Sequence, residues 1–300
     1  AMFAMQSGSA HMMKLLRKMG VRHRSALADP HNVANMLDTE SSARIIARLE
    51  SRGKDRIFQS LYEHYFPKLW CSERVLEIGC GTGVLMRALV KQEGFKGQVV
   101  GLDHSAAFLE AGHRLAQEDG CDMSRMAFVE ADAHRGNASL LQEPFDAIIL
   151  HTLLSHVTTP SEVLTQAHKL AAPGAMLVMM DGDYASLSYA HADDPPLGRS
   201  MDQALVAATF AQPDIMRQLP RLLPSAGWQL VDSSSQCVFE VGNAASYWVS
   251  FAKAYMPRVI ESGLVPEHQV NAWWAYQEKA LQKGEFFATG TYLTYLATKT

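Results

Sequence analysis

Cysteine is scarce in this sequence, and the four cysteines that are present do not form pairs. They are Cys71, Cys80, Cys121 and Cys237 in a chain of 300 residues. No two of them stand in a C-x-x-C spacing, which argues against a zinc ribbon and against a disulfide framework. We therefore expect free thiols and a protein of the reducing cytoplasm.

Long apolar runs and an excess of basic residues are also absent. No stretch approaches about 18 consecutive apolar residues, so the sequence predicts no membrane span. Lysine and arginine total 27, aspartate and glutamate total 31, and the net charge is −4. A mildly acidic chain has no general attraction for nucleic acid. We expect a small-molecule substrate as partner, no nucleic acid and no membrane span, and we leave a homodimer open.

The composition predicts a folded chain with a large core. Apolar residues make up 48% and charged residues 19%, which are ordinary values for a globular protein and exclude disorder of the whole chain. Residues 1–12 resemble a cloning remnant, and we leave them out of the fold. We expect a helical extension over 13–72 and one large α/β unit over 73–300. An insertion over 184–227 is expected to cover the substrate.

Short apolar runs alternate with helical patterns from residue 74 onward. The chain before this point, over 39–70, predicts one or two helices. The predicted strands are 74–78, 99–103, 126–130, 145–150, 175–180, 228–241 and 286–297. The predicted helices are 84–92, 106–117, 160–170, 247–261 and 267–282. Strands and helices in this alternation predict a doubly wound α/β fold, with a parallel sheet covered on both faces.

A glycine-rich turn follows the first predicted strand. Gly79, Gly81 and Gly83 follow Glu77 with the spacing GxGxG, which is neither a dinucleotide fingerprint nor a Walker loop. Asp103 ends the next strand about 20 residues further on, where a carboxylate can accept hydrogen bonds from both ribose hydroxyls. A glycine turn alone would indicate only a tight turn. Together, the turn and the carboxylate predict a site for a nucleoside-bearing cofactor.

These features resemble the class I S-adenosylmethionine-dependent methyltransferases. Five segments carry the resemblance, in the order that the family has them: 77–83, 101–105, 130–133, 145–151 and 170–175. Within the family, the chain is most similar to the small-molecule group of ubiquinone and menaquinone biosynthesis. The resemblance implies S-adenosylmethionine as cofactor. It also implies a mostly parallel, seven-stranded, Rossmann-like sheet with an antiparallel C-terminal strand.

Two positions depart from the family's pattern. Ala175 stands where the fifth motif usually has a second glycine, and Ser155 replaces the first histidine of the group's L-H-H stretch. The first departure leaves the turn before the fifth strand recognisable. Because of the second departure, fewer residues support the assignment to the quinone-related group than support the assignment to the family.

The resemblance also implies which residues bind the cofactor. They are Glu77, Gly79, Cys80, Gly81, Gly83, Asp103, His104, Asp132, Ala133 and His151. The three glycines would pass close to the amino-acid part, and Glu77 would orient the loop or receive the ammonium group through water. Asp103 would bind the ribose hydroxyls. His104 and Ser105 would flank the adenine, and Asp132 and the Ala133 amide would bind its edge.

Histidine is the natural candidate for a general base, because its ordinary pKa is about 6.5. We name His151 and His156 as catalytic candidates, and His191 as a third. Each has a structural alternative: His151 as a wall of the cofactor site, His156 as a packed side chain and His191 as an exposed loop residue. The carboxylates around the fifth strand are interpreted as solvated turn residues, and we expect no metal site. They are Asp181, Asp183, Asp193 and Asp194.

The resemblance implies methyl transfer to a small organic acceptor by in-line displacement. We expect oxygen as the acceptor atom first, then nitrogen or carbon. A D/N-P-P-Y motif is absent after the fourth strand, which disfavours methylation of bases and of glutamine. The alternative is a cyclase that uses the same fold and cofactor without net methyl transfer. The aromatic residues near the chain's end are expected to form core, with a few lining an apolar pocket.

Overall fold

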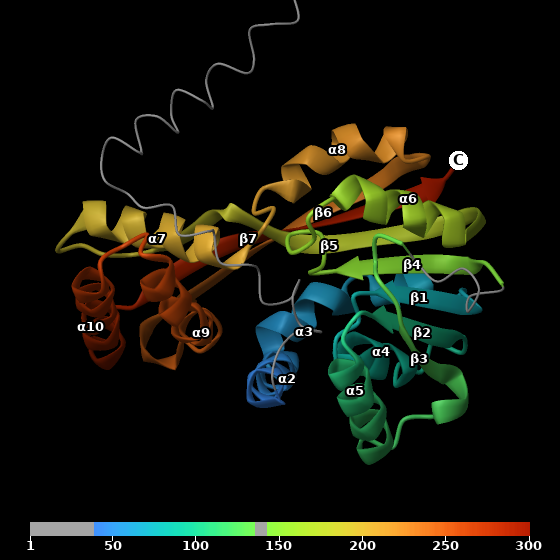
Figure 1. Cartoon of the computed structure of the whole chain (residues 1–300), viewed down its shortest axis with the longest axis horizontal. Coiled ribbons are helices and arrows are strands. Elements are labelled where there is room, and N and C mark those ends of the chain that lie inside the picture. Colours follow the sequence, from blue (N-terminus) through green and yellow to red (C-terminus); the bar gives the residue numbers. More distant parts are fainter. Residues whose placement is uncertain (1–38, 136–142) are drawn as a thin grey trace, which may run out of the picture.

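A computed structural model describes residues 39–135 and 143–300. The predicted cloning remnant and the first part of the predicted extension, residues 13–38, lie outside the described residues. The strands form one sheet in the order β3-β2-β1-β4-β5-β7-β6 (Figure 1). Their bounds are β1 (Arg74–Ile78), β2 (Gln98–Asp103), β3 (Met126–Glu130), β4 (Phe145–His151), β5 (Ala171–Tyr189), β6 (Trp228–Val241) and β7 (Phe287–Lys299).

The pairing of the strands confirms the predicted fold class. β1 pairs in parallel with β2 and β4, β2 with β3, and β4 with β5. β7 is antiparallel to both β5 and β6. The sheet is therefore mostly parallel, seven-stranded and Rossmann-like, with an antiparallel C-terminal strand. Because the first strands all run in one direction, the carboxyl ends of β1, β2 and β4 meet at one edge of the sheet.

Helices cover both faces of this sheet (Figure 1). Their bounds are α2 (Thr39–Gly53), α3 (Arg56–Glu63), α4 (Val84–Val90), α5 (Ala106–Glu118), α6 (Pro160–Leu170), α7 (Pro195–Thr209), α8 (Ile215–Ser225), α9 (Tyr247–Ser262) and α10 (Glu267–Lys283). Three short 3₁₀ helices are η2 (Phe66–Leu69), η3 (Met123–Arg125) and η4 (Gly242–Ala244). Every helix in the described ranges is too short or too polar to cross a lipid bilayer.

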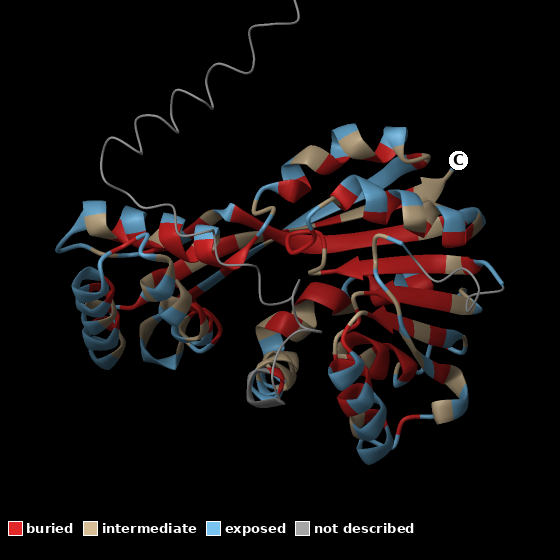
Figure 2. Ribbon diagram, in the orientation of Figure 1, coloured by how far each residue is buried: buried red, intermediate tan, exposed pale blue. Residues whose placement is uncertain are grey.

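The central strands are buried on both faces, and their side chains divide the core in two (Figure 2). In β4, Ala147 and Ile149 join the core on the side of α4 and α5, whereas Ile148 and Leu150 join the core beneath α6 and α8. This division follows from the strand period, which points successive side chains to opposite faces. Such two-sided burial explains why the parallel strands are apolar throughout.

The segment after the fifth motif differs from the prediction. β5 continues to Tyr189 and pairs with β7 over most of its length, so the insertion predicted over 184–227 begins inside a strand. The rest of this segment forms two helices. α8 packs with α6 against the sheet, as a crossover helix does, while α7 packs against α9 and α10. We call α7, α9 and α10 together the cap, because they pack on one another and on the long strand β5, away from the parallel strands β1–β3 (Figure 1).

The N-terminal extension is fastened to the glycine turn through one carboxylate. Glu50 of α2 accepts hydrogen bonds from Thr82 Oγ1 at 2.6 Å and from Arg87 Nη2 at 2.7 Å. Arg87 lies in α4 and also donates to Asp119 at 2.7 Å. The Arg87 side chain is only 8% exposed and that of Glu50 18%. A buried guanidinium of this kind needs both carboxylates, since each unpaired charge would be costly.

Glu50→Gln removes one of the two charges that Arg87 needs. We expect the free energy of unfolding to fall by about 3 kcal/mol, because a buried cation loses part of its partner. Urea denaturation followed by circular dichroism measures this change. Glu118→Gln is the matched control: it breaks the exposed pair between Arg114 and Glu118, and it should change stability by less than about 0.5 kcal/mol. Equal losses in both variants would contradict the role assigned to Glu50.

Candidate functional site

A cavity of about 420 Å³ opens where the carboxyl ends of β1, β2 and β4 meet. Ligands bind at this edge in open α/β sheets. The cavity brings together all the residues predicted for the site except Gly83, Ser105 and His191. Those that line it are Glu77, Gly79, Cys80, Gly81, Asp103, His104, Asp132, Ala133, His151 and His156. Further lining residues come from α2, α3 and the segment after β4.

The glycine turn needs its glycines for backbone conformation. Gly79, Gly81 and Gly83 have φ of 76°, 53° and 69°, in the left-handed region that disfavours other residues. A Cβ added to Gly79 would lie 2.6 Å from a methyl carbon of Leu153. Gly83 begins α4 and does not line the cavity, so its part in the site is to shape the turn.

Asp103 holds the turn and the start of α5 in place. Its Oδ2 accepts the backbone N–H of Gly81 at 2.8 Å, and its Oδ1 accepts the N–H of Ser105 at 2.9 Å. A carboxylate has about four acceptor positions, so both oxygens can still accept from a ligand in the cavity. Ser105 itself is buried and caps α5 by accepting from the N–H of Phe108. That capping role replaces the predicted position of Ser105 beside the adenine.

Glu77 lines the cavity and has a buried polar atom that is unsatisfied. The side chain is buried, and its Oε2 has no hydrogen-bond partner among the described residues. Burial, and then the charge of Asp103, raise the pKa of Glu77 well above its ordinary value, while a hydrogen bond from the Met86 backbone acts in the opposite direction. This carboxyl group therefore retains its proton more readily than an exposed glutamate does. A cation placed beside it would favour the ionised form.

Arg52 of α2 is a cavity residue that the sequence analysis missed. Its Nε is buried without a partner, and its Nη2 donates to Thr152 Oγ1 at 3.5 Å. The guanidinium also lies 4.4 Å above the ring of Phe58 from α3. A signal was present, because Arg52 stands one helical turn after Leu49, and both residues line the cavity. The apolar pattern of this helix drew attention to its packed face instead.

The opposite end of the cavity is formed by Asp132 and its neighbours after β3. Asp132 Oδ1 accepts the backbone N–H of His134 at 2.8 Å and lies 2.9 Å from His134 Nδ1. Burial acts to raise the pKa of Asp132, but these contacts with His134 lower it overall. Asp132 is thus held as a carboxylate acceptor. His134 also lines the cavity and was not predicted from the sequence.

The two candidate catalytic histidines both line the cavity, in different surroundings. His151 is buried among the rings of Phe58, Tyr62 and Tyr65, and its Nδ1 lies 2.7 Å from the Tyr65 hydroxyl. Its Nε2 has no partner among the described residues. Burial, followed by the positive charges of Arg52 and His64, lowers the pKa of His151 well below its ordinary value.

His156 lies against a different ring and near a buried carboxylate. Its imidazole is 5.2 Å from the ring of Phe210. Burial raises the pKa of Asp181, and the charge of His156 acts to lower it. Asp181 also accepts hydrogen bonds from the N–H and hydroxyl of Ser155 and from the N–H of Gly182. Asp181 is therefore a buried acceptor in this network, where the sequence analysis expected a solvated turn residue.

The structure does not bring the third histidine into the cavity. His191 stacks on Tyr276 of α10 with ring centres 4.0 Å apart, and its Nδ1 accepts the N–H of Asp194. Asp183 forms a two-pronged ion pair with Arg217, both contacts being 2.8 Å. Over residues 39–135 and 143–300, no group of three or more His, Cys, Asp and Glu side chains could hold a metal ion.

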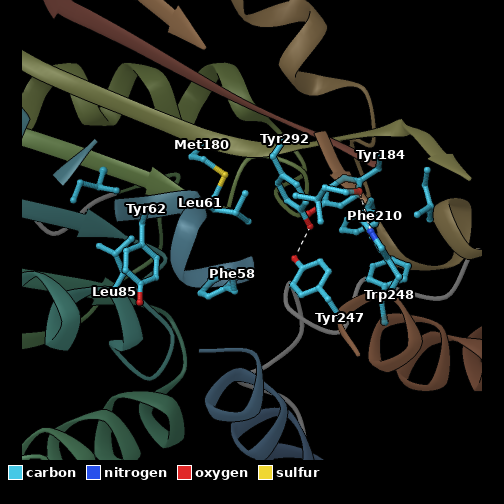
Figure 3. Close-up of a cluster of buried hydrophobic side chains, with 14 of the residues drawn as sticks. Phe58, Leu61, Tyr62, Leu85, Met180, Tyr184, Phe210, Tyr247, Trp248 and Tyr292 are labelled. Carbon is cyan, nitrogen blue, oxygen red and sulfur yellow. Dashed lines mark hydrogen bonds between the residues drawn. The ribbon is translucent and has the colours of Figure 1, made fainter. Parts of the chain in front are cut away.

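Two of the aromatic residues predicted as core or pocket, Tyr247 and Trp248, belong to a packed aromatic cluster between α3 and the cap (Figure 3). Tyr184 stacks on Phe210 at 3.5 Å between ring centres, and the hydroxyls of Tyr247 and Tyr292 lie 2.7 Å apart. All four side chains are buried. They therefore act as core, and Phe210 forms an aromatic wall behind His156, with the two rings 5.2 Å apart.

The family comparison covers the part of the chain that forms this site. Residues 71–238 match the family model described as a methyltransferase domain. The matched range is more than half of the chain. It includes the glycine turn, Asp103, Asp132 and both candidate histidines.

Curated relatives match different shares of the chain. The uncharacterized 37.1 kDa protein in transposon TN4556 of Streptomyces fradiae is 26% identical over 76% of this chain and 63% of that protein. The ubiquinone biosynthesis O-methyltransferase of Histophilus somni is 30% identical over 35% of this chain and 43% of that protein. The 2-phytyl-1,4-naphtoquinone methyltransferase of Synechococcus elongatus is 37% identical over 36% of this chain and 46% of that protein. The chain thus spans about half the length of the curated relatives it matches.

Solved structures share the fold. The YcgJ protein of Bacillus subtilis aligns with a TM-score of 0.52 and 14% identity, covering 80% of this chain and 98% of that chain. A protein from Bacillus halodurans aligns with a TM-score of 0.50 and 16% identity, covering 79% and 97%. These likenesses bear on the fold alone. Taken with the family match and with the motifs gathered around one cavity, they confirm that this chain belongs to the class I S-adenosylmethionine-dependent methyltransferases.

Proposed function

We propose that this chain transfers a methyl group from S-adenosylmethionine to a small organic acceptor. The observation that carries the proposal is a pair of buried polar atoms without partners, Glu77 Oε2 and Arg52 Nε, in one cavity. An amino-acid group supplies what both atoms lack, because its ammonium pairs with a carboxylate and its carboxylate pairs with a guanidinium. A pyrophosphate would instead place negative charge beside Glu77 and Asp103.

The other end of the cavity suits a nucleoside. Asp103 keeps acceptor positions free for two ribose hydroxyls after binding the N–H groups of Gly81 and Ser105. Asp132, fixed by His134, can accept from an adenine amino group, and Ala133 offers a backbone N–H beside it. His104 lines the cavity next to Asp103 and can cover the base. The order of these groups follows the order of the cofactor's parts.

The residues of this chain then have to position the acceptor and receive its proton. When bound, the cofactor supplies a methyl group on a sulfonium, whose leaving group is a neutral thioether. Holding two reactants in line can contribute roughly 7–11 kcal/mol. His151 and His156 border the region where the two would meet. The aromatic wall of Tyr184 and Phe210 behind His156 excludes water from that region.

Oxygen is the acceptor atom that we propose first, followed by nitrogen and carbon. Relatives of this chain are named as an O-methyltransferase of ubiquinone biosynthesis and as a naphthoquinone methyltransferase. A phenolic or quinone-like acceptor fits a cavity with aromatic walls better than a nucleic acid does. All four cysteines are free thiols, which supports the proposal that the protein acts in the cytoplasm.

The function is tested by incubating the protein with methyl-labelled S-adenosylmethionine and a panel of phenols and hydroxyquinones. We expect labelled product and S-adenosylhomocysteine to form in equal amounts. A product that forms while the cofactor is not consumed would instead support a cyclase. Absence of S-adenosylhomocysteine binding in a calorimeter would overturn the proposal.

Asp103→Ala removes the acceptor for two backbone N–H groups and for the ribose. We expect the affinity for S-adenosylhomocysteine to fall about 100-fold, because charge-assisted hydrogen bonds are lost. Calorimetry measures the affinity. Asp146→Ala is the control, because Asp146 also accepts two backbone N–H groups, those of Glu73 and Arg74, but at the opposite edge of the sheet. Unchanged affinity in Asp103→Ala would exclude the ribose role.

The raised pKa of Glu77 predicts that cofactor binding is coupled to proton release. In the free protein the carboxyl group retains its proton well above its ordinary range, and a bound ammonium favours the ionised form. Affinity for S-adenosylhomocysteine should therefore weaken as the pH falls through the raised pKa. Calorimetry in buffers of different ionisation enthalpy counts the released protons.

Glu77→Gln should abolish this proton release and flatten the dependence of affinity on pH. Glu130→Gln, at the exposed end of β3, should leave both unchanged. Proton release that persists in Glu77→Gln would show that another group is responsible. In that case Glu77 would act only by orienting the turn.

A further inference from the structure

Tyr65 shares a hydrogen bond with His151, which lines the cavity. The Tyr65 hydroxyl lies 2.7 Å from His151 Nδ1, and the residues are 1% and 5% exposed. Tyr65 directly precedes η2, whereas His151 is the last residue of β4. The bond thus joins the N-terminal extension to the sheet. Within the described residues it is the one hydrogen bond of the Tyr65 hydroxyl.

The position of the Tyr65 hydroxyl proton follows from this single hydrogen bond. Burial, and then the charge of Glu77, raise the pKa of Tyr65 well above its ordinary value, so the hydroxyl is neutral. Its single proton needs an acceptor, because an unpaired buried donor is disfavoured. His151 Nδ1 is the acceptor within reach. The Tyr65 hydroxyl therefore donates, and Nδ1 carries a lone pair.

The other ring nitrogen must then carry the proton of the imidazole. Burial and the positive charges of Arg52 and His64 keep His151 neutral. A neutral imidazole has one N–H, and when Nδ1 accepts, the hydrogen resides on Nε2. Nε2 is buried, has no partner among the described residues, and belongs to a residue that lines the cavity.

We propose that Tyr65 locks His151 in the Nε2–H tautomer, so that His151 donates a hydrogen bond to an oxygen of the methyl acceptor and does not take its proton. Tyr65 is a positioning residue that acts through His151. The inference rests on the proposed function, and it specifies which chemical class of methyl acceptor the cavity takes. The acceptor carries a carbonyl, enolate or phenolate oxygen that can accept this hydrogen bond.

A different group must receive the proton of a hydroxyl acceptor. As the oxygen lone pair forms its bond to the methyl carbon, the electron pair of the methyl–sulfur bond goes to sulfur, and the hydroxyl proton has to leave. His151 has no lone pair to offer at Nε2. His156 is the other candidate histidine that lines the same cavity, and it interacts electrostatically with the buried carboxyl group of Asp181. The proton therefore goes to His156. The two histidines then have different roles: His151 donates a hydrogen bond and His156 accepts the proton.

The tautomer is measured directly by two-bond ¹H–¹⁵N correlation spectra of protein labelled in its histidines. His151→Gln identifies the His151 signals. In the wild type we expect a protonated Nε2 and an unprotonated, hydrogen-bonded Nδ1. Tyr65→Phe should convert this to a mixture of both tautomers. Protonation of Nδ1, or a charged ring, in the wild type would overturn the proposal.

Tyr62→Phe is the matched control for the lock. Tyr62 lies in the same aromatic group, with its ring centre 6.1 Å from that of His151, but its hydroxyl does not bond to the imidazole. The tautomer should remain unchanged in this variant. A shift equal to that of Tyr65→Phe would show that packing, and not the hydrogen bond, selects the tautomer.

The substrate class is tested with 4-nitrophenolate as the probe, added to the complex with S-adenosylhomocysteine. The His151 Nε2–H signal should move downfield on binding, and His151→Phe should bind the probe about 10- to 100-fold more weakly. Equal affinities, an unmoved signal at saturation or no binding to the wild type would each overturn the oxygen-acceptor class. Since the tautomer is recorded without cofactor, failure of S-adenosylhomocysteine to bind would overturn the proposed function alone.

Discussion

The ionic contact of Glu50 with Arg87 and Thr82 is the interaction on which the site depends most. Without it α2 has no polar anchor on the glycine turn, and the cavity loses the side that α2 and α3 supply. That side brings Arg52 beside Thr152 in the cavity, and the chain that follows it brings Tyr65 to the imidazole of His151. The strand ends and the segments that follow them line most of the cavity. The helical extension adds Leu49, Arg52 and Phe58, which line its remaining side.

Residues that line the cavity carry buried polar atoms without hydrogen-bond partners. Glu77 and Asp103 are two buried carboxyl groups at one edge of the sheet, and the charge of one raises the pKa of the other. Arg52 has a buried donor without a partner. Burying such groups is unfavourable unless a ligand completes them. In the free protein these groups are therefore unfavourable, and a zwitterion would supply the partners that they lack. Preorganised sites favour their ligands in this way.

The sequence predicted the parts of the structure that depend on local signals. Strand periods, the left-handed glycines and the carboxylate at Asp103 can each be recognised within a few residues. Arg52 and Tyr65 were missed because their roles arise from contacts between distant segments; Tyr65 and His151 are 86 positions apart. His134 was also missed, although its contact with Asp132 is local in the sequence. The extension of β5 was missed for a similar reason. Its polar residues, Asp181 and Asp183, suggest a turn until β7 pairs with them.

The pairing of β6 and β7 has a mechanical consequence. The two strands stay in register from Trp228 to Val241, with one shift near Leu230, and so the same ribbon runs from the sheet to the helices beyond it. A rigid-body swing of those helices would have to bend a hydrogen-bonded ribbon. The side of the cavity formed by α2 and α3 is held by side-chain contacts and not by backbone hydrogen bonds between strands. It is therefore the side that moves more easily. We therefore expect small molecules to enter and leave the cavity on the side of α2 and α3, while the β6–β7 ribbon stays in place.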